Sequence, residues 1–362
     1  MKMNLWERNI RRVVPYVPGE QPKKEKMIKL NTNENPYPPA PRVKELMEDT
    51  ALYDRLRLYP DPAVTMLVDA IAARNDLSGD RVFAGVGSDD VLAMAFLTFF
   101  NSEKPVFFPD ITYSFYDVWA DLFRIPYERK ELDQDFCIRP SDYYGENGGV
   151  IFPNPNAPTG VLLPLAEVRD ILDHNRDVVV IVDEAYIDFG GISARSLLDE
   201  YENLLIVQTF SKSRSMAGMR IGYAMGSAAL IKALNDVKYS FNSYTMDLPS
   251  ILWGTASVED EAYFRETLGR IVETREWFKD QMKALGFHFP DSKANFIFAS
   301  HESVPAVKIF EAAREQDIYV RYFNKPRIDN YLRITIGTRE EMETFLEFLK
   351  NYLNRESFTG QS

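Results

Sequence analysis

Lys212 is the residue of this 362-residue chain with the strongest case for chemistry. It follows an apolar run, residues 204–207, which predicts a buried strand with the lysine just past its end. Serines flank the lysine, Arg220 lies further along the same loop, and Ala217 and Gly218 allow a backbone or ligand to approach closely. A lone loop lysine is usually a solvated surface cation. This combination favours instead an amine that forms an imine beside a bound phosphate.

Asp183 and Tyr186 lie just past a second apolar run, residues 178–182, which also predicts a buried strand. A carboxylate at the end of a buried strand is costly unless it is paired. Pairing with a protonated pyridine nitrogen would satisfy Asp183 and keep the ring an electron sink, and Tyr186 could hydrogen-bond a phenolic oxygen on that ring. A carboxylate that caps the next element and, less strongly, a metal ligand are the competing interpretations.

A glycine-containing loop, residues 85–90 (GVGSDD), connects a predicted strand to a predicted helix. Free backbone N–H groups at a helix N-terminus bind phosphate without needing a cation. A simple helix cap with acidic residues in its first turn explains the same residues. The third glycine of a dinucleotide-binding fingerprint is missing, so the loop does not predict that kind of site.

Four other residues could complete a ligand site. Asn156, in a turn after the predicted strand 150–152, could donate its amide to the same ring oxygen, and Tyr113 could stack on a flat cofactor. Ordinary turn chemistry and a core aromatic are the alternatives. Arg321 and Arg333 lie in predicted C-terminal strands, where an anion suits arginine because its fork binds two oxygens at once. Surface ion pairs are the alternative for both.

Most of these residues follow predicted apolar strands that alternate with helices. Strands that are apolar throughout predict a largely parallel α/β sheet with helices on both faces. Ligands bind beyond the carboxyl ends of such strands. The strands are predicted at residues 81–84, 106–108, 150–152, 178–182 and 204–207, with a return strand at 220–224, and the helices at 63–75, 91–100, 114–123 and 165–175.

After about residue 245 the pattern changes to a long helical segment, residues 258–285, followed by short strands and helices. This change predicts a smaller α/β domain at the C-terminus. We therefore expect an N-terminal arm at residues 1–30, which packs on the small domain or on a partner subunit, a large domain at residues 31–250 and a small domain at residues 251–362.

Composition narrows the class of protein. The formal net charge is −12, which argues against nucleic acid or an anionic membrane as the main partner. The single cysteine, Cys137, cannot form an intramolecular disulfide, and the three histidines are scattered, so a metal site is not expected. The chain has no apolar signal segment and no run of transmembrane length, so we expect a cytoplasmic protein.

Eight short motifs occur together along the chain: LNTNENPY, YPDP, GVGSDD, PDITYSFY, NPNAPTG, VDEAYIDF, TFSKSRSMAGMRIGY and YLRITIGTRE. In this order, over nearly the whole length, they resemble the fold-type I pyridoxal-phosphate-dependent aminotransferases of the class II group. More narrowly, they are similar to the histidinol-phosphate aminotransferase family.

This resemblance implies pyridoxal 5'-phosphate as the cofactor, and Lys212 as the lysine that forms the aldimine and shuttles a proton between substrate and cofactor. The other cofactor-binding residues that it implies are Asp183 at the pyridine nitrogen, Tyr186 and Asn156 at the ring oxygen, Tyr113 over the ring, and Ser88, Asp89, Ser211 and Arg220 at the phosphate. The substrate-binding residues that it implies are Arg333 at the carboxylate of glutamate, with Arg321 and Tyr16 joining it at the phosphate of histidinol phosphate. Tyr59 would reach the cofactor phosphate from the other subunit of a homodimer.

The sequence departs from the family pattern at three places. Ala157 stands where the family usually has asparagine before Pro-Thr-Gly, and Asn156 is one residue earlier. Residues 213–215 (SRS) replace small and aromatic residues after the lysine, and residues 241–244 (FNSY) differ from a more common small-residue version. The first departure concerns the ring-oxygen contact, and the last concerns the substrate pocket.

The reaction that the resemblance implies is reversible ping-pong transamination in histidine biosynthesis. Glutamate would give its amino group to the cofactor, and imidazole-acetol phosphate would then receive it. An aromatic amino acid aminotransferase and a threonine-phosphate decarboxylase share the lysine and the aspartate, so they remain alternatives on the same scaffold. A cofactor-binding regulator without turnover is a remote alternative, since such regulators carry a DNA-binding module for which the start of this acidic chain leaves no room.

Overall fold

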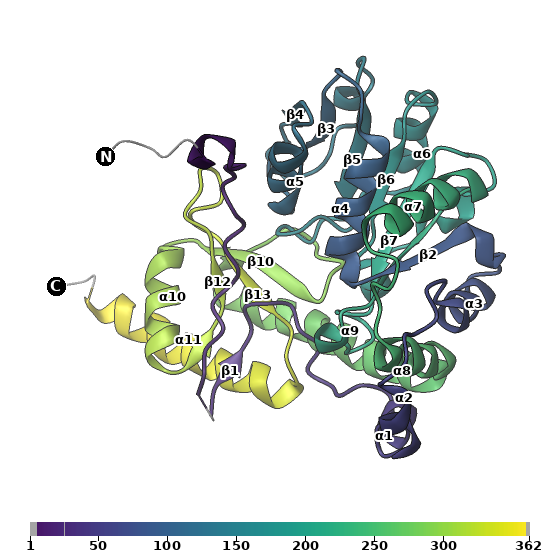
Figure 1. Cartoon of the computed structure of the whole chain (residues 1–362). Helices are drawn as coiled ribbons and strands as arrows, with labels where there is room; N and C mark the ends of the chain where they lie inside the picture. Colours follow the sequence, from purple (N-terminus) through teal and green to yellow (C-terminus); the bar gives the residue numbers. More distant parts are fainter. Residues whose placement is uncertain (1–5, 25, 360–362) are drawn as a thin grey trace.

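A seven-stranded sheet organises the larger part of the chain in the computed structural model, which describes residues 6–24 and 26–359 (Figure 1). Its neighbouring strands are parallel except at β8, which runs antiparallel to both of its neighbours. In order across the sheet the strands are β2 (Val82–Gly85), β8 (Gly222–Met225), β7 (Leu204–Thr209), β6 (Val180–Asp183), β5 (Gly149–Pro153), β3 (Val106–Pro109) and β4 (Tyr127–Lys130).

The central strands are apolar throughout because both faces of this sheet are covered. Val180 and Val182 of β6 pack into the core on one face, and Ile181 between them packs into the core on the other. Helices of the first core are α3 (Thr65–Arg74), α6 (Leu165–Asp173) and α8 (Leu248–Glu259), and helices of the second are α4 (Gly87–Phe99), α5 (Phe115–Phe123) and α7 (Ala228–Phe241). This arrangement confirms the predicted fold class.

A smaller unit surrounds a four-stranded antiparallel sheet and has its own hydrophobic core. Its strands, in order, are β12 (Arg321–Tyr322), β13 (Leu332–Thr335), β10 (Phe296–His301) and β9 (Phe287–His288). Its helices are α9 (Glu261–Ala284), α10 (Ala306–Glu315) and α11 (Arg339–Thr359), and Figure 1 shows α10 and α11 on its left side.

The described N-terminal segment has a short 3-10 helix, η1 (Trp6–Asn9), and no regular secondary structure over residues 11–24. Further along, β1 (Ile28–Lys29) pairs in parallel with β11 (Ile318–Tyr319) of the smaller unit. An ion pair joins Glu20 of this segment to Arg314. Upstream, Arg11 donates to the carbonyl of Leu122 in α5. The segment therefore contacts both units. Residues 1–5 and residue 25 of the predicted arm lie outside the described residues.

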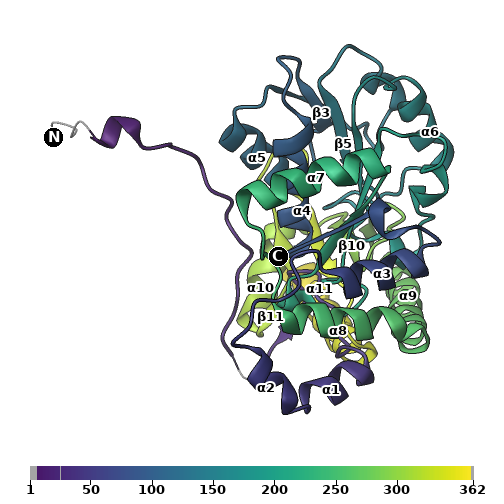
Figure 2. The ribbon, with the colours of Figure 1, turned by 45° about the vertical axis from the view of Figure 1, so that its right-hand side comes forward.

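Two helices that were not predicted, α7 and α8, follow β8 and precede the long predicted helix. The predicted helical segment 258–285 is α9, which begins three residues later because Asp260 lies outside helical geometry and its side chain accepts from the backbone N–H of Tyr263 to cap the helix. The predicted domain division at residue 250 falls inside α8, which packs on α3 and on α1 (Pro41–Met47), as Figure 2 shows. A further short helix, α2 (Ala51–Arg55), follows α1. None of the described helices combines the length and apolar composition that a membrane span requires.

Candidate active site

The polar residues singled out in the sequence gather where the parallel strands of the large sheet end. Asp183 is the last residue of β6 and only 4% of its surface is exposed. It accepts hydrogen bonds from the Tyr116 hydroxyl (2.9 Å) and the Ala185 backbone N–H (3.2 Å). Burial raises the pKa of Asp183 to about 6, and none of the described cations lies against it. A cationic ligand group would stabilise this carboxylate.

Lys212 lies in the turn after β7, and neighbouring segments hold its backbone. The Asn35 side-chain amide donates to the carbonyls of Lys212 (2.9 Å) and Ser213 (3.2 Å). The Ser213 hydroxyl donates to Asp188 (2.6 Å). The Lys212 amine itself donates to the carbonyl of Thr32 (3.2 Å). The backbone of the loop is thus fixed by side chains, while the amine makes one neutral hydrogen bond and no ion pair within the described chain.

A cradle for an anion lies at the start of α4. Gly87, its first residue, has φ +83°, and a Cβ there would lie 2.5 Å from Nη2 of Arg220. Arg220 donates to the Ser211 hydroxyl (3.3 Å) and to Asp89 (3.3 Å). The close packing brings a guanidinium, a hydroxyl and the helix N-terminus at Ser88 together, which suits a phosphate.

Tyr113 lies over the same region. Its hydroxyl donates to Asp89 (2.7 Å), so Asp89 connects the tyrosine to Arg220. Its ring packs against Phe115 and, edge-on, against Trp119. Burial and the Asp89 charge raise the pKa of Tyr113, so its hydroxyl stays protonated. The ring is a fixed apolar surface beside the cradle.

Tyr186 faces Lys212 from the loop after β6. The Lys212 amine lies 5.8 Å from the centre of its ring, and the Tyr186 hydroxyl accepts from the side-chain amide of Asn33 (2.9 Å). Phe296 packs edge-on against the ring. Asn33 was not predicted as a site residue, although it belongs to the LNTNENPY motif.

Asn156 is buried, and its amide already has protein partners. The side-chain nitrogen donates to the Ile111 carbonyl (3.0 Å) and to the Thr159 hydroxyl (3.0 Å), and its oxygen accepts from Thr112 (3.2 Å). Both amide hydrogens therefore have acceptors. A contact from Asn156 to a ligand oxygen stays a prediction, and it would require one of these bonds to be exchanged.

Arg321 and Arg333 lie directly opposite each other in the antiparallel pair β12–β13. Both guanidinium groups lie 5.6 Å from the ring centre of Phe323, and Arg333 also donates to the Asn31 carbonyl (3.0 Å). Nε of Arg333 is buried without a partner, and no carboxylate in the described ranges pairs with either arginine. Burial lowers the pKa of Arg333, and Arg321 lowers it further. Opposed like charges destabilise a sheet, so this pair suits an anion between them.

Tyr16 and Tyr59 have different surroundings. Tyr16 stacks on Phe115 with ring centres 4.1 Å apart, and Phe115 in turn packs against Tyr113. Tyr59 is 82% exposed and contacts Tyr244. Among the described residues, Tyr59 therefore has no contact with another predicted site residue.

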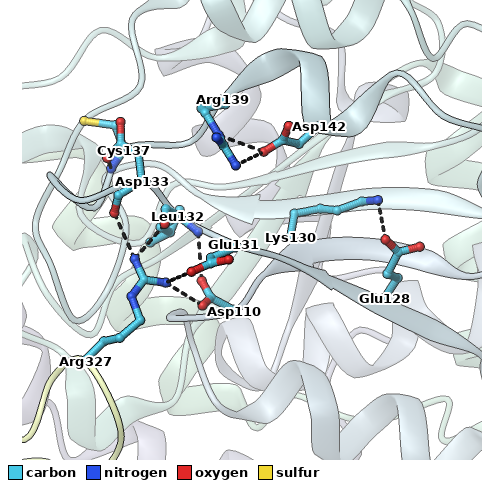
Figure 3. A network of polar contacts seen from close by, with 10 residues as sticks. All are labelled: Asp110, Glu128, Lys130, Glu131, Leu132, Asp133, Cys137, Arg139, Asp142 and Arg327. Carbon is cyan, nitrogen blue, oxygen red and sulfur yellow. Dashed lines mark hydrogen bonds and ion pairs between the residues drawn. The ribbon is translucent and has the colours of Figure 1, made fainter.

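Arg327, in the loop between the two arginine-bearing strands, contacts the segments that follow β3 and β4 of the large sheet (Figure 3). Arg327, in the connection between β12 and β13, pairs with Asp110 (2.8 Å) and Glu131 (3.4 Å). It also donates to the carbonyls of Leu132 (2.6 Å) and Asp133 (2.9 Å). Asp110 directly follows β3 and begins the loop that leads to the tyrosine over the cradle. Sequence reasoning missed Arg327, and no local pattern marks it.

The family model for class I and II aminotransferases matches residues 25–349 of this chain. The chain belongs to this aminotransferase family. It is 51% identical over 348 residues to the histidinol-phosphate aminotransferase of Lactococcus lactis subsp. cremoris (strain MG1363), covering 96% of this chain and 98% of the relative. It is 50% identical over 350 residues to that of Clostridium botulinum (strain Okra / Type B1), covering 97% and 99%.

Solved structures share the fold of this aminotransferase. The histidinol-phosphate aminotransferase of Clostridium acetobutylicum superposes with a TM-score of 0.84 at 22% identity, over 91% of this chain and all of that one. The enzyme of Sinorhizobium meliloti, solved with pyridoxal-5'-phosphate, superposes with a TM-score of 0.80 at 20% identity, over 91% and 92%. The resemblance stated from the motifs is confirmed.

For this aminotransferase we expect Arg327→Met to raise the KM for anionic substrates about tenfold and to leave kcat nearly unchanged. The substitution removes a charged tether that aligns the two arginine-bearing strands, and tenfold corresponds to about 1.4 kcal/mol of binding. Steady-state kinetics measure the effect. Arg139→Met is the control, because the one ion pair of Arg139 among the described residues is with nearby Asp142 and does not reach the smaller unit (Figure 3). Equal KM changes in both variants would contradict the tether.

Proposed function

We propose that this aminotransferase transfers the amino group between histidinol phosphate and 2-oxoglutarate, with pyridoxal 5'-phosphate as its cofactor. The observation that best supports this choice of substrate is the opposed pair of Arg321 and Arg333, which has no acidic partner in the described part of the chain. Phosphate and carboxylate are the anions that arginine forks bind best. The names of the relatives at about 50% identity agree with this substrate.

The residues fit the proposed cofactor group by group. Asp183 is a buried carboxylate that a pyridinium nitrogen would pair with, and the cradle around Arg220 suits the phosphate. Tyr186 offers a hydroxyl near the Lys212 amine, and Tyr113 offers a flat surface. When bound, pyridoxal phosphate supplies an aldehyde and a ring that delocalises charge.

The residues of this chain would bind the substrates and move the proton. Arg333 would bind the carboxylate of glutamate, and Arg333, Arg321 and Tyr16 together would bind the phosphate of histidinol phosphate. These groups place the amino end of either substrate toward Lys212. The Lys212 amine would bind the cofactor and then, once released, carry the proton of the substrate carbon.

Kinetics with a panel of amino donors test the substrate. We expect kcat/KM for histidinol phosphate to exceed that for phenylalanine by at least about 10²-fold, since a phosphate on two arginines is worth several charge-assisted hydrogen bonds. Threonine phosphate should yield no decarboxylated product. A preference for phenylalanine, or release of carbon dioxide from threonine phosphate, would contradict the proposal.

We expect Asp183→Asn to stabilise the cofactor-free protein above pH 6. Burial raises the pKa of Asp183 from its usual 3.8 to about 6, so the folded state binds more protons than the unfolded state between these values. The free energy of unfolding therefore falls as pH rises through this window, by roughly 3 kcal/mol in total. Urea unfolding at pH 3.5 and pH 8 measures the difference, which should appear only at pH 8. A variant no more stable than the parent at pH 8 would contradict this.

The proposal includes a homodimer, which is supported by exposed apolar side chains around Tyr59. The exposed residues near it in the chain are Met47, Tyr53, Leu56 and Leu58, and Phe241 and Tyr244 lie at the end of α7 and just after it. Exposed patches of this kind mark interfaces. Tyr59 would then complete the phosphate cradle of the partner subunit. Sedimentation should give twice the 41.7 kDa of the chain, and an active monomer would refute the dimer.

A further inference from the structure

The resemblance implies an amide donor to the ring oxygen at residue 157, which is an alanine in this chain. Ala157 carries no amide at the position before Pro158, and the amide hydrogens of Asn156 already have the acceptors Ile111 and Thr159. Tyr186 is the other predicted partner of that oxygen. A tyrosine hydroxyl has one proton and can donate to one acceptor only, so the direction of that proton matters.

Asn33 is the group that faces the Tyr186 hydroxyl. It is 1% exposed and has φ +56°, a left-handed conformation that asparagine tolerates better than most residues. Its backbone N–H donates to the Thr335 hydroxyl (3.0 Å), and its carbonyl accepts from the Asn295 amide (3.0 Å). Two residues of the smaller unit therefore hold the backbone of Asn33: Thr335 in β13 and Asn295, which directly precedes β10.

The orientation of the Asn33 side chain follows from Thr335. The Thr335 hydroxyl accepts from the Asn33 N–H, and its own proton points to the side-chain oxygen of Asn33 (3.1 Å). The side-chain nitrogen then faces Tyr186, to which it donates (2.9 Å). An amide nitrogen is a donor only, so it cannot take the Tyr186 proton.

We infer that Asn33 is a positioning residue, which directs the hydroxyl proton of Tyr186 toward the phenolic oxygen of the cofactor and so offsets the amide missing at Ala157. The inference rests on the proposed function. Accepting a hydrogen bond from Asn33 occupies a lone pair of the Tyr186 oxygen and leaves its proton free for another acceptor. Accepting one bond also strengthens the bond that the hydroxyl donates.

The visible spectrum of the cofactor-loaded enzyme reports on this contact as pH is varied. The lysine-bound chromophore loses a proton as pH rises, and this loss changes its absorbance. A hydrogen-bond donor to the phenolic oxygen stabilises the negative charge of that oxygen, and it does so most in the deprotonated form of the chromophore. Loss or weakening of the donor therefore moves the spectral transition to higher pH. We expect a shift of about one pH unit or more in Tyr186→Phe, and about half a unit in Asn33→Gly, which removes the amide and accommodates the left-handed backbone.

A double-mutant cycle separates this role from a general structural one. Asn33→Gly should cause no further shift in the Tyr186→Phe background, because Asn33 acts through the Tyr186 hydroxyl. Asn33→Asp, which keeps the shape but offers an acceptor that takes the Tyr186 proton, should shift the transition at least as far as Asn33→Gly. The inference would be overturned by an unchanged transition in Asn33→Gly and Asn33→Asp. It would also be overturned if Asn33→Gly caused the same shift in the parent and in the Tyr186→Phe background. A parent protein with no lysine-bound chromophore would instead refute the proposed function.

Discussion

Lys212→Ala is expected to abolish transamination, with kcat lowered by at least about 10³-fold, and to remove the visible absorbance of the lysine-bound cofactor. The amine is the proposed covalent attachment point and proton carrier, and a positioned general base alone contributes about 10²–10⁴-fold. The fold should survive, because the side chain makes a single hydrogen bond to the residues that the structure describes, to the Thr32 carbonyl. Absorbance spectra of the loaded protein and far-UV circular dichroism measure both expectations.

The control for this variant is a lysine of the large unit away from the site. Lys232, on α7, makes an exposed ion pair with Asp236 and no other in the described part of the chain, so Lys232→Ala should keep both absorbance and turnover. Reduction of the loaded parent protein with borohydride, followed by peptide mapping, should place the label on Lys212. A Lys212→Ala protein that keeps the absorbance of the parent would contradict the assignment.

The two arginines are expected to differ in which substrates depend on them. Arg333→Met should raise the KM for both glutamate and histidinol phosphate by about 10–100-fold, since each charge-assisted hydrogen bond is worth about 1.5–3 kcal/mol. Arg321→Met should raise it only for histidinol phosphate, because Arg321 is proposed to bind only the phosphate. Half-reactions with each substrate alone, followed by the cofactor spectrum, separate the two effects.

Stability gives the arginine pair an independent test. Removing either arginine relieves the repulsion between opposed cations in β12–β13, so each variant should be more stable than the parent by a few tenths of a kcal/mol to about 1 kcal/mol. Arg314→Met removes an exposed ion pair with Glu20 and serves as the control. An Arg321→Met protein whose KM rises equally for glutamate and for histidinol phosphate would contradict the division of roles.

Much of the candidate site could be predicted because strand-end position carries chemical information. Asp183 and Lys212 follow buried apolar strands, and parallel strands bring their carboxyl ends to one edge of the sheet. The fold class followed from the same pattern. The polar strand β4 did not, because Tyr127–Lys130 is an edge strand with exposed charges, which protect an edge but hide the strand pattern.

Other features depend on contacts between segments that are distant in the sequence. The opposition of Arg321 and Arg333 requires the register of β12 and β13, which a nine-residue connection does not determine. Arg327 acts across the two units, and Asn33 is separated from Tyr186 by 153 positions. Periodicity and local motifs report only on near neighbours, so these residues became visible only in the folded chain.

The most direct test of the account is a single half-reaction of the cofactor-loaded enzyme with histidinol phosphate and no amino acceptor. Lys212, Asp183 and the arginine pair together predict that the lysine-bound absorbance converts to that of the amine form of the cofactor, with one equivalent of imidazole-acetol phosphate released per site. Glutamate should cause the same conversion, and 2-oxoglutarate should reverse it. An unchanged spectrum with histidinol phosphate, alongside conversion by phenylalanine, would leave the fold and the lysine in place but contradict the proposed substrate.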